Sequence, residues 1–303
     1  MNRFDLLTCF LLSIFTLSGI AGCTPGNGKS QDATEVNADI NIVSAPQKDV
    51  LLTYWDNFDF QDTLALRNPE IGEQTLVDFI TALKKFPDTI SAKAVKHMLS
   101  KAKRSPASFR YFTQQYDHYL YDPNSPLRND TYYQPVLEFL LDSCLLNETD
   151  KYRYNSLLKL VRKNQTGTVA ADFEFQLSRG KKRSLYDISA PFTLLFFYEP
   201  GCPHCEEAIE QFETTPGFQR LVKNGKLNVL AIYAMGDQNI WKAYQPHIPA
   251  GWTNGLDRNM RVLNHGLYEI RASPTLYLLD KDKVVLLKDT DLRQVASFFN
   301  ANV

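Results

Sequence analysis

An apolar stretch that runs directly into two closely spaced cysteines constrains the fold of this chain most. Residues 193–198 (T-L-L-F-F-Y) are apolar almost throughout, which predicts a central β-strand covered on both faces. After three intervening residues the sequence C-P-H-C extends from Cys202 to Cys205, and from residue 208 apolar residues recur at helical spacing. A strand, a C-x-x-C sequence and a helix, in that order, are what a redox-active dithiol requires.

The two cysteines are predicted to have different roles. Cys202 precedes the first helical position and Pro203 occupies it, where a fixed φ angle and a missing N–H do no harm. Unpaired backbone N–H groups and the positive end of the helix dipole then stabilise a thiolate at Cys202, the predicted nucleophile. Cys205 lies one turn deeper and is the predicted resolving thiol. No cofactor is expected besides the redox-active disulfide Cys202–Cys205.

Two other interpretations of the cysteine pair are an inert disulfide and half of a zinc site. Such a short loop would gain little unfolded-state entropy from being closed. After Cys205 there is no further cysteine to complete a zinc site, only the separated His247 and His265. A copper-handling site that uses both cysteines and His265 fits less well, because C-x-x-C lacks the wider spacing of copper-delivery thioredoxin folds. We predict no metal.

Residues 202–205 after an apolar strand, together with residues 270–280 (I-R-A-S-P-T-L-Y-L-L-D), resemble the thioredoxin superfamily, nearest to its TlpA/ResA-like envelope branch. In that family the proline of the second motif is cis and lies against the dithiol. The resemblance therefore implies this position for Pro274, with Ser273 and Thr275 beside it as substrate-binding residues.

Two departures from the family pattern concern proton transfer. Phe196 stands where many thioredoxins have a buried aspartate, and Gly201 replaces the tryptophan before the first cysteine. The usual proton acceptor for the resolving thiol is therefore missing. Glu199 is the expected substitute, since Glu206 and Glu207 are expected to be exposed helix carboxylates.

The direction of electron transfer is left open by the sequence. The dipeptide Pro203-His204 also occurs in strongly oxidising DsbA-type enzymes, where the histidine adds a positive partner for the thiolate and stabilises the reduced form. The architecture, in contrast, resembles reductases and isomerases of the TlpA/ResA-like branch. We therefore name Pro203 and His204 as catalytic candidates beside the cysteines without assigning a direction.

The first 23 residues are typical of an export signal. A positive start is followed by a mainly apolar stretch, residues 6–17, and by small residues that end in Cys23. The apolar stretch is shorter than the ~20 residues that a membrane span needs. Ile20-Ala21-Gly22-Cys23 resembles a bacterial lipobox, which implies a signal peptide over 1–22 and a lipid on Cys23.

Residues 23–46 are predicted to be a lipidated N-terminus and flexible tether. The chain is then expected in the cell envelope, lipid-anchored and facing the periplasm. The residue after the lipidated cysteine is Thr24, and not the acidic residue that serves there as an inner-membrane retention signal. The outer membrane is therefore favoured over the inner membrane. The expected partners are the membrane, thiols and disulfides of envelope proteins, and a membrane redox partner. A formal net charge of -1 gives no positive field for nucleic acid.

Residues 47–165 are predicted to form an all-α helical domain, because their apolar residues recur every three or four positions. The domain resembles one that bacterial envelope lipoproteins combine with a thioredoxin-like domain, and whose role is unassigned. His97 and His118 are interpreted as structural, and Cys144 as a buried thiol. The predicted helices cover residues 76–86, 90–103, 106–120, 132–146 and 149–161.

The predicted fold class is α/β: the helical domain is followed, over residues 166–303, by a thioredoxin-like fold with a central mixed sheet flanked by helices. The expected strands cover residues 173–177, 193–198, 227–233, 275–279 and 284–287. The predicted function is an enzyme, an envelope thiol-disulfide oxidoreductase acting on protein clients. The alternative is a lipid-anchored partner-binding protein whose helical domain recognises the partner and whose thioredoxin-like domain is largely a scaffold.

Overall fold

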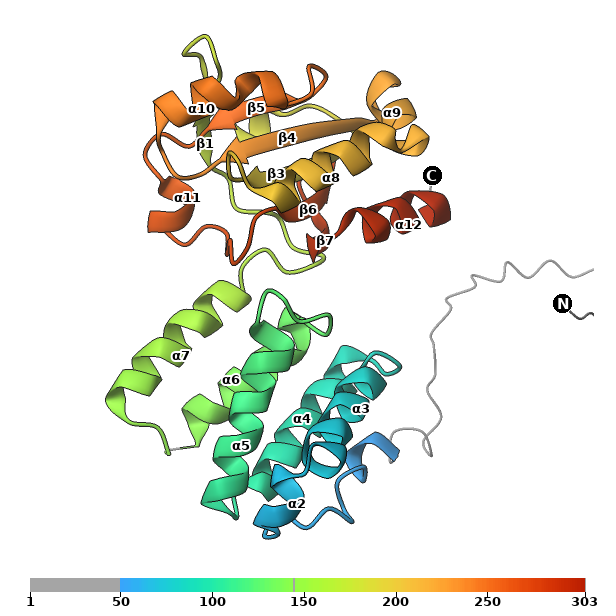
Figure 1. Cartoon of the computed structure of the whole chain (residues 1–303), viewed down its shortest axis with the longest axis vertical. Helices are drawn as coiled ribbons and strands as arrows, with labels where there is room; N and C mark the ends of the chain where they lie inside the picture. The colour runs from blue at the N-terminus through green and yellow to red at the C-terminus, as the bar shows by residue number, and fades with distance from the viewer. Residues whose placement is uncertain (1–49, 144, 303) are drawn as a thin grey trace, which may run out of the picture. The chain divides into compact units, whose positions relative to one another are not determined.

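The computed structural model describes residues 50–143 and 145–302 (Figure 1). The predicted signal peptide, Cys23, the tether and Cys144 lie outside these residues. The described residues form a run of helices followed by an α/β part with one mixed sheet, which confirms the predicted fold class.

All five helices predicted in the first part are present, with ends shifted by a few residues. α6 begins at Asp130, earlier than predicted, because the Asn129 side chain accepts a hydrogen bond from the N–H of Tyr132 and caps the helix. The predicted helix over 106–120 is interrupted after Tyr116 by a π-helical turn. The elements are α2 Thr63–Arg67, η1 Pro69–Glu73, α3 Gln74–Leu83, α4 Asp88–Ala102, α5 Pro106–Tyr116, η2 Asp117–Tyr121, α6 Asp130–Asp142 and α7 Glu148–Val161.

The helical part has a core of its own, which is rich in aromatic rings. Trp55 lies at its centre and makes edge-to-face contacts with Phe79 and Phe112, with ring centroids 5.5 and 5.3 Å apart. All three side chains are almost completely buried. Burying a side chain of this size contributes about 1.5–3 kcal/mol, so the helices owe their stability mainly to this packing.

The α/β part contains one seven-stranded sheet with the order β2-β1-β5-β4-β3-β6-β7. The pairs β3–β4 and β4–β5 are parallel and the others are antiparallel. The five predicted strands are present, while the short β2 and β5 were not predicted. The bounds are β1 Glu174–Gln176, β2 Lys182–Ser184, β3 Phe192–Tyr198, β4 Leu227–Tyr233, β5 Thr253–Leu256, β6 Thr275–Asp280 and β7 Val285–Thr290.

β3 is covered on both faces, as the sequence predicted. Leu194 and Phe196 point into one core, which α8 covers, whereas Leu195 and Phe197 point into the core on the other face. Helix α8 runs across its face of the sheet (Figure 1). The other helical elements are η3 Leu185–Asp187, α8 Pro203–Thr214, α9 Pro216–Lys223, α10 Gln238–Tyr244, η4 Gln245–His247, α11 Arg261–Asn264 and α12 Leu292–Asn302.

Glu138 of α6 links neighbouring helices through its carboxylate. It accepts hydrogen bonds from Lys96 of α4 at 2.6 Å, from Gln134 at 2.8 Å and from Arg162, just after α7, at 2.9 Å. Burial by itself would raise the pKa of Glu138, but these hydrogen bonds outweigh it and lower the pKa to about 2.

We predict that Glu138→Gln destabilises the protein at pH 7 by about 1 kcal/mol, since the carboxylate is partly exposed. A carboxyl whose pKa is lowered on folding stabilises the fold above its unfolded pKa, near 4.5, and loses that contribution as the pH falls towards about 2. Urea unfolding at pH 7, 4 and 2.5 should therefore show the difference shrinking. Glu148→Gln, which alters an exposed pair with Lys151, is the control. A difference independent of pH would contradict this explanation.

Candidate redox site

A tight turn carries the chain from β3 into α8. The carbonyl of Glu199 accepts a hydrogen bond from the N–H of Cys202 at 3.1 Å, which closes a β-turn. Pro200 occupies its second position, and Gly201, with a φ of 77°, its third; this is the type II pattern. A side chain would be strained at this φ, so glycine at the position of the family's tryptophan follows from the local backbone.

Cys202 is the N-cap of α8 and Pro203 its first residue, as the sequence predicted. The Cys202 carbonyl accepts hydrogen bonds from the N–H groups of Cys205 at 3.0 Å and Glu206 at 3.1 Å. The Cys202 sulfur therefore lies at the positive end of the helix dipole. It is half-buried, whereas Cys205 is completely buried against the sheet.

The second sequence motif lies against the first. The Ser273–Pro274 peptide bond is cis, and the Cys202 thiol donates a hydrogen bond to the Ser273 carbonyl at 3.3 Å. Thr275 is buried, and its hydroxyl donates to the carbonyl of Ala272 at 2.6 Å. Its side chain thus supports the loop from within. Client binding by Ser273, Pro274 and Thr275 stays a prediction.

Burial makes Cys205 a weak acid. Removal from water raises the pKa of its thiol to about 12; a hydrogen bond with the Glu199 backbone opposes the shift, and the neighbouring Cys202 and Glu199 add to it. Cys205 is therefore protonated at neutral pH and needs a proton acceptor before it can act as a nucleophile.

The carboxylates around the thiols lie on the surface. Glu199 is exposed, and its charge acts on Cys205. Glu206 and Glu207 are exposed, in agreement with the sequence; Glu207 lies 3.2 Å from Nδ1 of His204. The exposed His204 ring thus has a carboxylate partner that the sequence analysis did not foresee, one helical turn along α8.

Tyr244 is a further neighbour of the dithiol that the sequence analysis missed. Its hydroxyl donates to Glu206 at 3.3 Å, and its ring stacks on Tyr198, the last residue of β3, with centroids 5.8 Å apart. The pKa of the Tyr244 hydroxyl is raised to about 12. Burial is the largest cause, and the nearby Glu206 and the two thiols add to it. An aromatic at this position could have been found only from the fold, because 39 residues separate it from Cys205.

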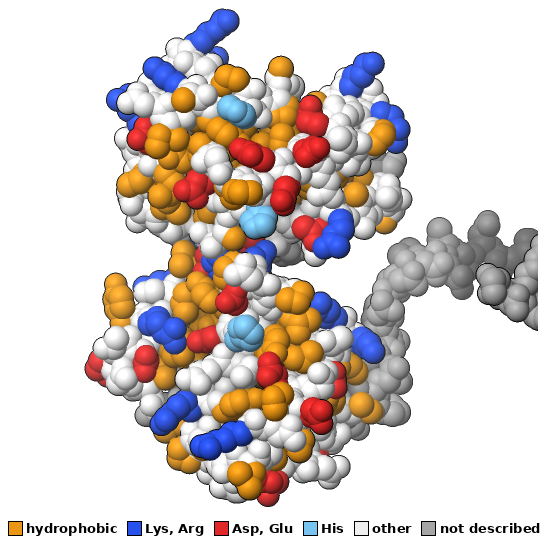
Figure 2. Space-filling view, in the orientation of Figure 1, with side chains coloured by type: hydrophobic (Ala, Val, Ile, Leu, Met, Phe, Trp, Pro, Cys, Tyr) orange, Lys and Arg blue, Asp and Glu red, His pale blue; other side chains and the backbone are white. Residues whose placement is uncertain are grey.

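The surface over α8 is acidic. Helix α8 carries the exposed residues Glu206, Glu207, Glu210 and Glu213. Figure 2 shows acidic side chains over the part of the surface where α8 lies in Figure 1. On the face shown, Lys and Arg side chains are scattered. The side chains along α8 therefore present negative charge to the solvent.

A small cavity of about 250 Å³ lies next to the turn that precedes Cys202. Glu199 from the turn and Ser273 from the second motif line it, together with Met235, which follows β4 and is 51 % exposed. The lining of this cavity thus combines backbone polar groups with an apolar side chain.

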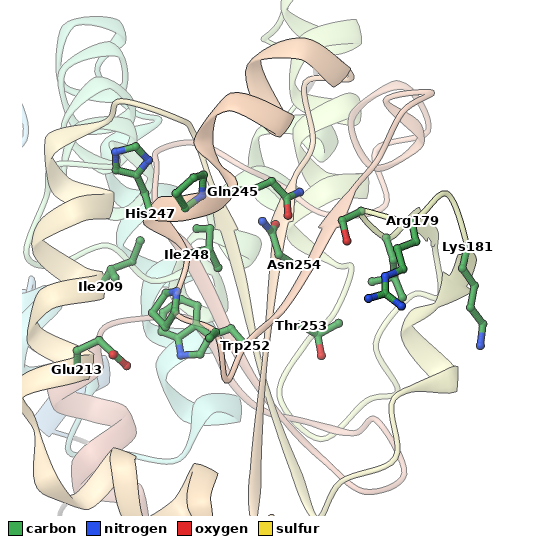
Figure 3. Close-up of a pocket in the computed structure, with 15 residues that line it drawn as sticks. Arg179, Lys181, Ile209, Glu213, Gln245, His247, Ile248, Trp252, Thr253 and Asn254 are labelled. Carbon is green, nitrogen blue, oxygen red and sulfur yellow. The ribbon is translucent and has the colours of Figure 1, made fainter.

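A larger cavity of about 830 Å³ lies elsewhere in the α/β part (Figure 3). Ile209 and Glu213 of α8 line one side, and Thr253 and Asn254 of β5 line another. Neither cavity has Cys202 or Cys205 in its lining. Size alone would point to the larger cavity, but the smaller one is lined by Glu199 and Ser273, whose carbonyls both accept hydrogen bonds from Cys202.

Two further features concern metals and membranes. Within 50–143 and 145–302, no three His, Cys, Asp or Glu side chains are grouped as a metal site would need. Over the same residues, we find no helix whose length and apolar character would let it cross a bilayer. His97 and His118 lie on α4 and η2.

Comparison with known proteins supports the fold. The chain is 36 % identical to a thioredoxin-like protein from Bacteroides caccae ATCC 43185, whose crystal structure it matches with a TM-score of 0.81; the match covers 90 % of this chain and all of the other. A fold with a cysteine pair at the N-terminus of α8, facing a cis-proline, defines the class. The chain belongs to the thioredoxin-like proteins.

Other matches cover one part of the chain. Residues 41–164 match a family described as a domain of unknown function, DUF5106. The C-terminal domain of an uncharacterised protein from Bacteroides fragilis NCTC 9343 is 42 % identical, over 45 % of this chain and 98 % of that one, with a TM-score of 0.45. A domain of a possible thiol-disulfide isomerase from Cytophaga hutchinsonii is 26 % identical, over 46 % and 94 %, with a TM-score of 0.41. No curated protein matches.

We predict that iodoacetamide at pH 7 alkylates Cys202 of the reduced protein at least about tenfold faster than Cys205, because Cys202 is partly exposed whereas Cys205 is completely buried and its burial raises the pKa of its thiol. Peptide mapping by mass spectrometry after timed quenching measures both sites in one sample. The same reaction in urea is the control and should equalise the rates. Equal rates in the folded protein would contradict the geometry.

Proposed function

We propose that this protein is a thiol-disulfide oxidoreductase of the cell envelope, in the TlpA/ResA-like manner, and that it exchanges disulfides with protein clients. One observation carries the proposal: a half-buried thiol at a helix N-terminus, hydrogen-bonded to a cis-proline loop, with a second thiol buried one turn behind it. An inert disulfide has no need of this asymmetry between the two cysteines.

In the reducing direction, the Cys202 thiolate attacks one sulfur of a client disulfide. A bond forms between Cys202 and that sulfur, the client's S–S bond breaks, and the second client sulfur leaves as a thiolate that takes up a proton. Cys205 then loses its proton and attacks the Cys202 sulfur; the bond between Cys202 and the client sulfur breaks, and that sulfur leaves as a thiolate that takes up a proton. The client is released with two thiols, reduced by two electrons, and the disulfide Cys202–Cys205 remains.

An external dithiol must then reduce this disulfide, and we assign that task to a membrane redox partner. In the oxidising direction the same steps run in reverse. His204 favours the reduced pair when protonated, although its ring also interacts with Glu207. Glu199 is the proposed acceptor for the Cys205 proton, because its charge acts on that thiol.

The proposed location follows from the N-terminal residues. A signal peptide over 1–22 exports the chain, and acyl chains on Cys23 keep the protein on the periplasmic side of a membrane, with the outer membrane favoured. Each buried methylene contributes about 0.8 kcal/mol, so several acyl chains give a stable anchor. The tether then lets the folded part reach clients at a distance from the bilayer.

The test of the proposed chemistry is equilibration of the protein in glutathione buffers, combined with reduction of insulin disulfides. We expect a reversible two-electron couple, loss of activity in Cys202→Ser, and accumulation of a client mixed disulfide in Cys205→Ser. The measured potential decides between reductant and oxidant. A disulfide that no thiol buffer reduces would exclude the enzyme and favour the partner-binding alternative.

The test of the anchor is metabolic labelling with a radioactive fatty acid in a bacterial host. The wild-type chain should carry the label and sediment with membranes, whereas Cys23→Ser should do neither. Cys9→Ser, which changes another cysteine in the N-terminal residues, should behave like the wild type. Label retained in Cys23→Ser would show that the lipid is attached elsewhere.

A further inference from the structure

Arg271 joins the loop that contacts Cys202 to the helical part of the chain. It lies three residues before Pro274, and its side chain is only 7 % exposed. Its guanidinium donates to the carbonyl oxygen of Tyr121 at 3.0 Å, to Asp130 at 2.8 Å and to Asp289 at 3.0 Å. Two of these three acceptors belong to the helical part: Tyr121 ends η2 and Asp130 begins α6.

Tyr121 makes two more contacts with the same segment. Its ring faces the guanidinium of Arg271, with 4.7 Å between the guanidinium carbon and the ring centroid, a cation–π contact. Its hydroxyl donates to Glu269 at 2.6 Å, and Glu269 lies 3.8 Å from Nε of Arg271. The Tyr121 ring also stacks on Tyr133 of α6, which fixes it within the helical core.

The charges in this cluster balance. Burial raises the pKa values of Glu269 and Asp289, and neighbouring cations oppose both shifts, Arg271 among them. Buried charges are tolerated only when they are paired, so the cluster constrains where each member lies. Its members are the carboxylates Asp130, Glu269 and Asp289 and the cations Arg128, Arg271 and Lys288.

We propose that the helical domain positions the client-binding loop of the redox site: Tyr121 and Asp130 hold Arg271, and Arg271 holds the segment Ala272–Pro274 in place beside Cys202. Arg271 is then a positioning residue, and residues 41–164, which match a domain of unknown function, have a function in client binding. The inference rests on the proposed function, because a fixed loop matters only if clients bind there.

The cluster also contains a matched control. Lys288 of β7 has a buried side chain too, and it binds Asp130 as well as the carbonyls of Val161 and Lys163, each at 2.8 Å. It joins the same two parts of the chain but does not lie in the loop. Lys288→Met therefore removes contacts between the two parts, among them one to Asp130, but removes none of the contacts that Arg271 itself makes with Tyr121, Asp130 and Asp289.

The experiment compares two substrates of the full chain: insulin, whose disulfides are flanked by polypeptide that must bind along the loop, and the small aromatic disulfide DTNB, which needs no loop. In Arg271→Lys we expect kcat/KM for insulin to fall about tenfold, mostly through KM, because a displaced loop binds an extended chain poorly. The rate with DTNB should stay within about threefold of wild type. In Lys288→Met both rates should stay within about threefold.

A second pair of variants keeps the proposal testable if Arg271→Lys does not fold. Tyr121→Phe removes only the hydroxyl that reaches Glu269, and a smaller, insulin-selective loss is expected. Tyr119→Phe removes a hydroxyl that bonds Glu73 within the helical part, and no selective loss is expected. If Arg271→Lys and Lys288→Met lower both rates equally, or if neither lowers the insulin rate, the cluster only joins the two parts and the positioning role is wrong. A wild type inactive on both substrates overturns the proposed function as well.

Discussion

The site depends on the burial of β3 on both of its faces. Hydrogen bonds to β4 and β6 hold its edges, and alternate side chains enter the cores above and below the sheet. A strand fixed on four sides ends at a defined point, Tyr198, and the type II turn that follows leaves little freedom before Cys202. The helix N-terminus therefore presents its thiol from a rigid base, as an exchange site needs.

The register of the sheet explains why two distant motifs meet. β6 pairs antiparallel with β3, and Thr275 at its start lies opposite Phe197 near the end of β3. The residues just before β6 must therefore lie beside the residues just after β3. This brings the Ser273 carbonyl to the Cys202 thiol, although the two are 71 residues apart. The cis-proline loop is thus placed by strand pairing, and in our proposal the contacts of the neighbouring Arg271 with Tyr121 and Asp130 then hold the start of the loop.

The sequence predicted those parts of the fold that local pattern determines. The run of apolar residues in β3, the C-P-H-C motif and the helical spacing after it are all short-range signals, and the second motif became interpretable through the family resemblance. The strands β2 and β5 were missed because K-R-S and T-N-G-L have no apolar alternation. The Arg271 cluster was missed because its partners Tyr121 and Asp130 lie at least 141 residues away, and nothing local distinguishes a buried arginine from an exposed one.

The complete burial of Cys205 has a kinetic meaning in the proposed reaction. A client sulfur can bond only to Cys202, so every encounter passes through a single covalent complex. The lifetime of that complex is set by how fast Cys205 gives up its proton, a property of this protein and not of the client. If the cysteines of a client rearrange within the lifetime of this mixed disulfide, the client leaves with isomerised disulfides. If they rearrange more slowly, the client leaves reduced or oxidised by two electrons. The burial of Cys205 thus determines which clients are isomerised and which are oxidised or reduced, according to how fast the disulfides of each client rearrange.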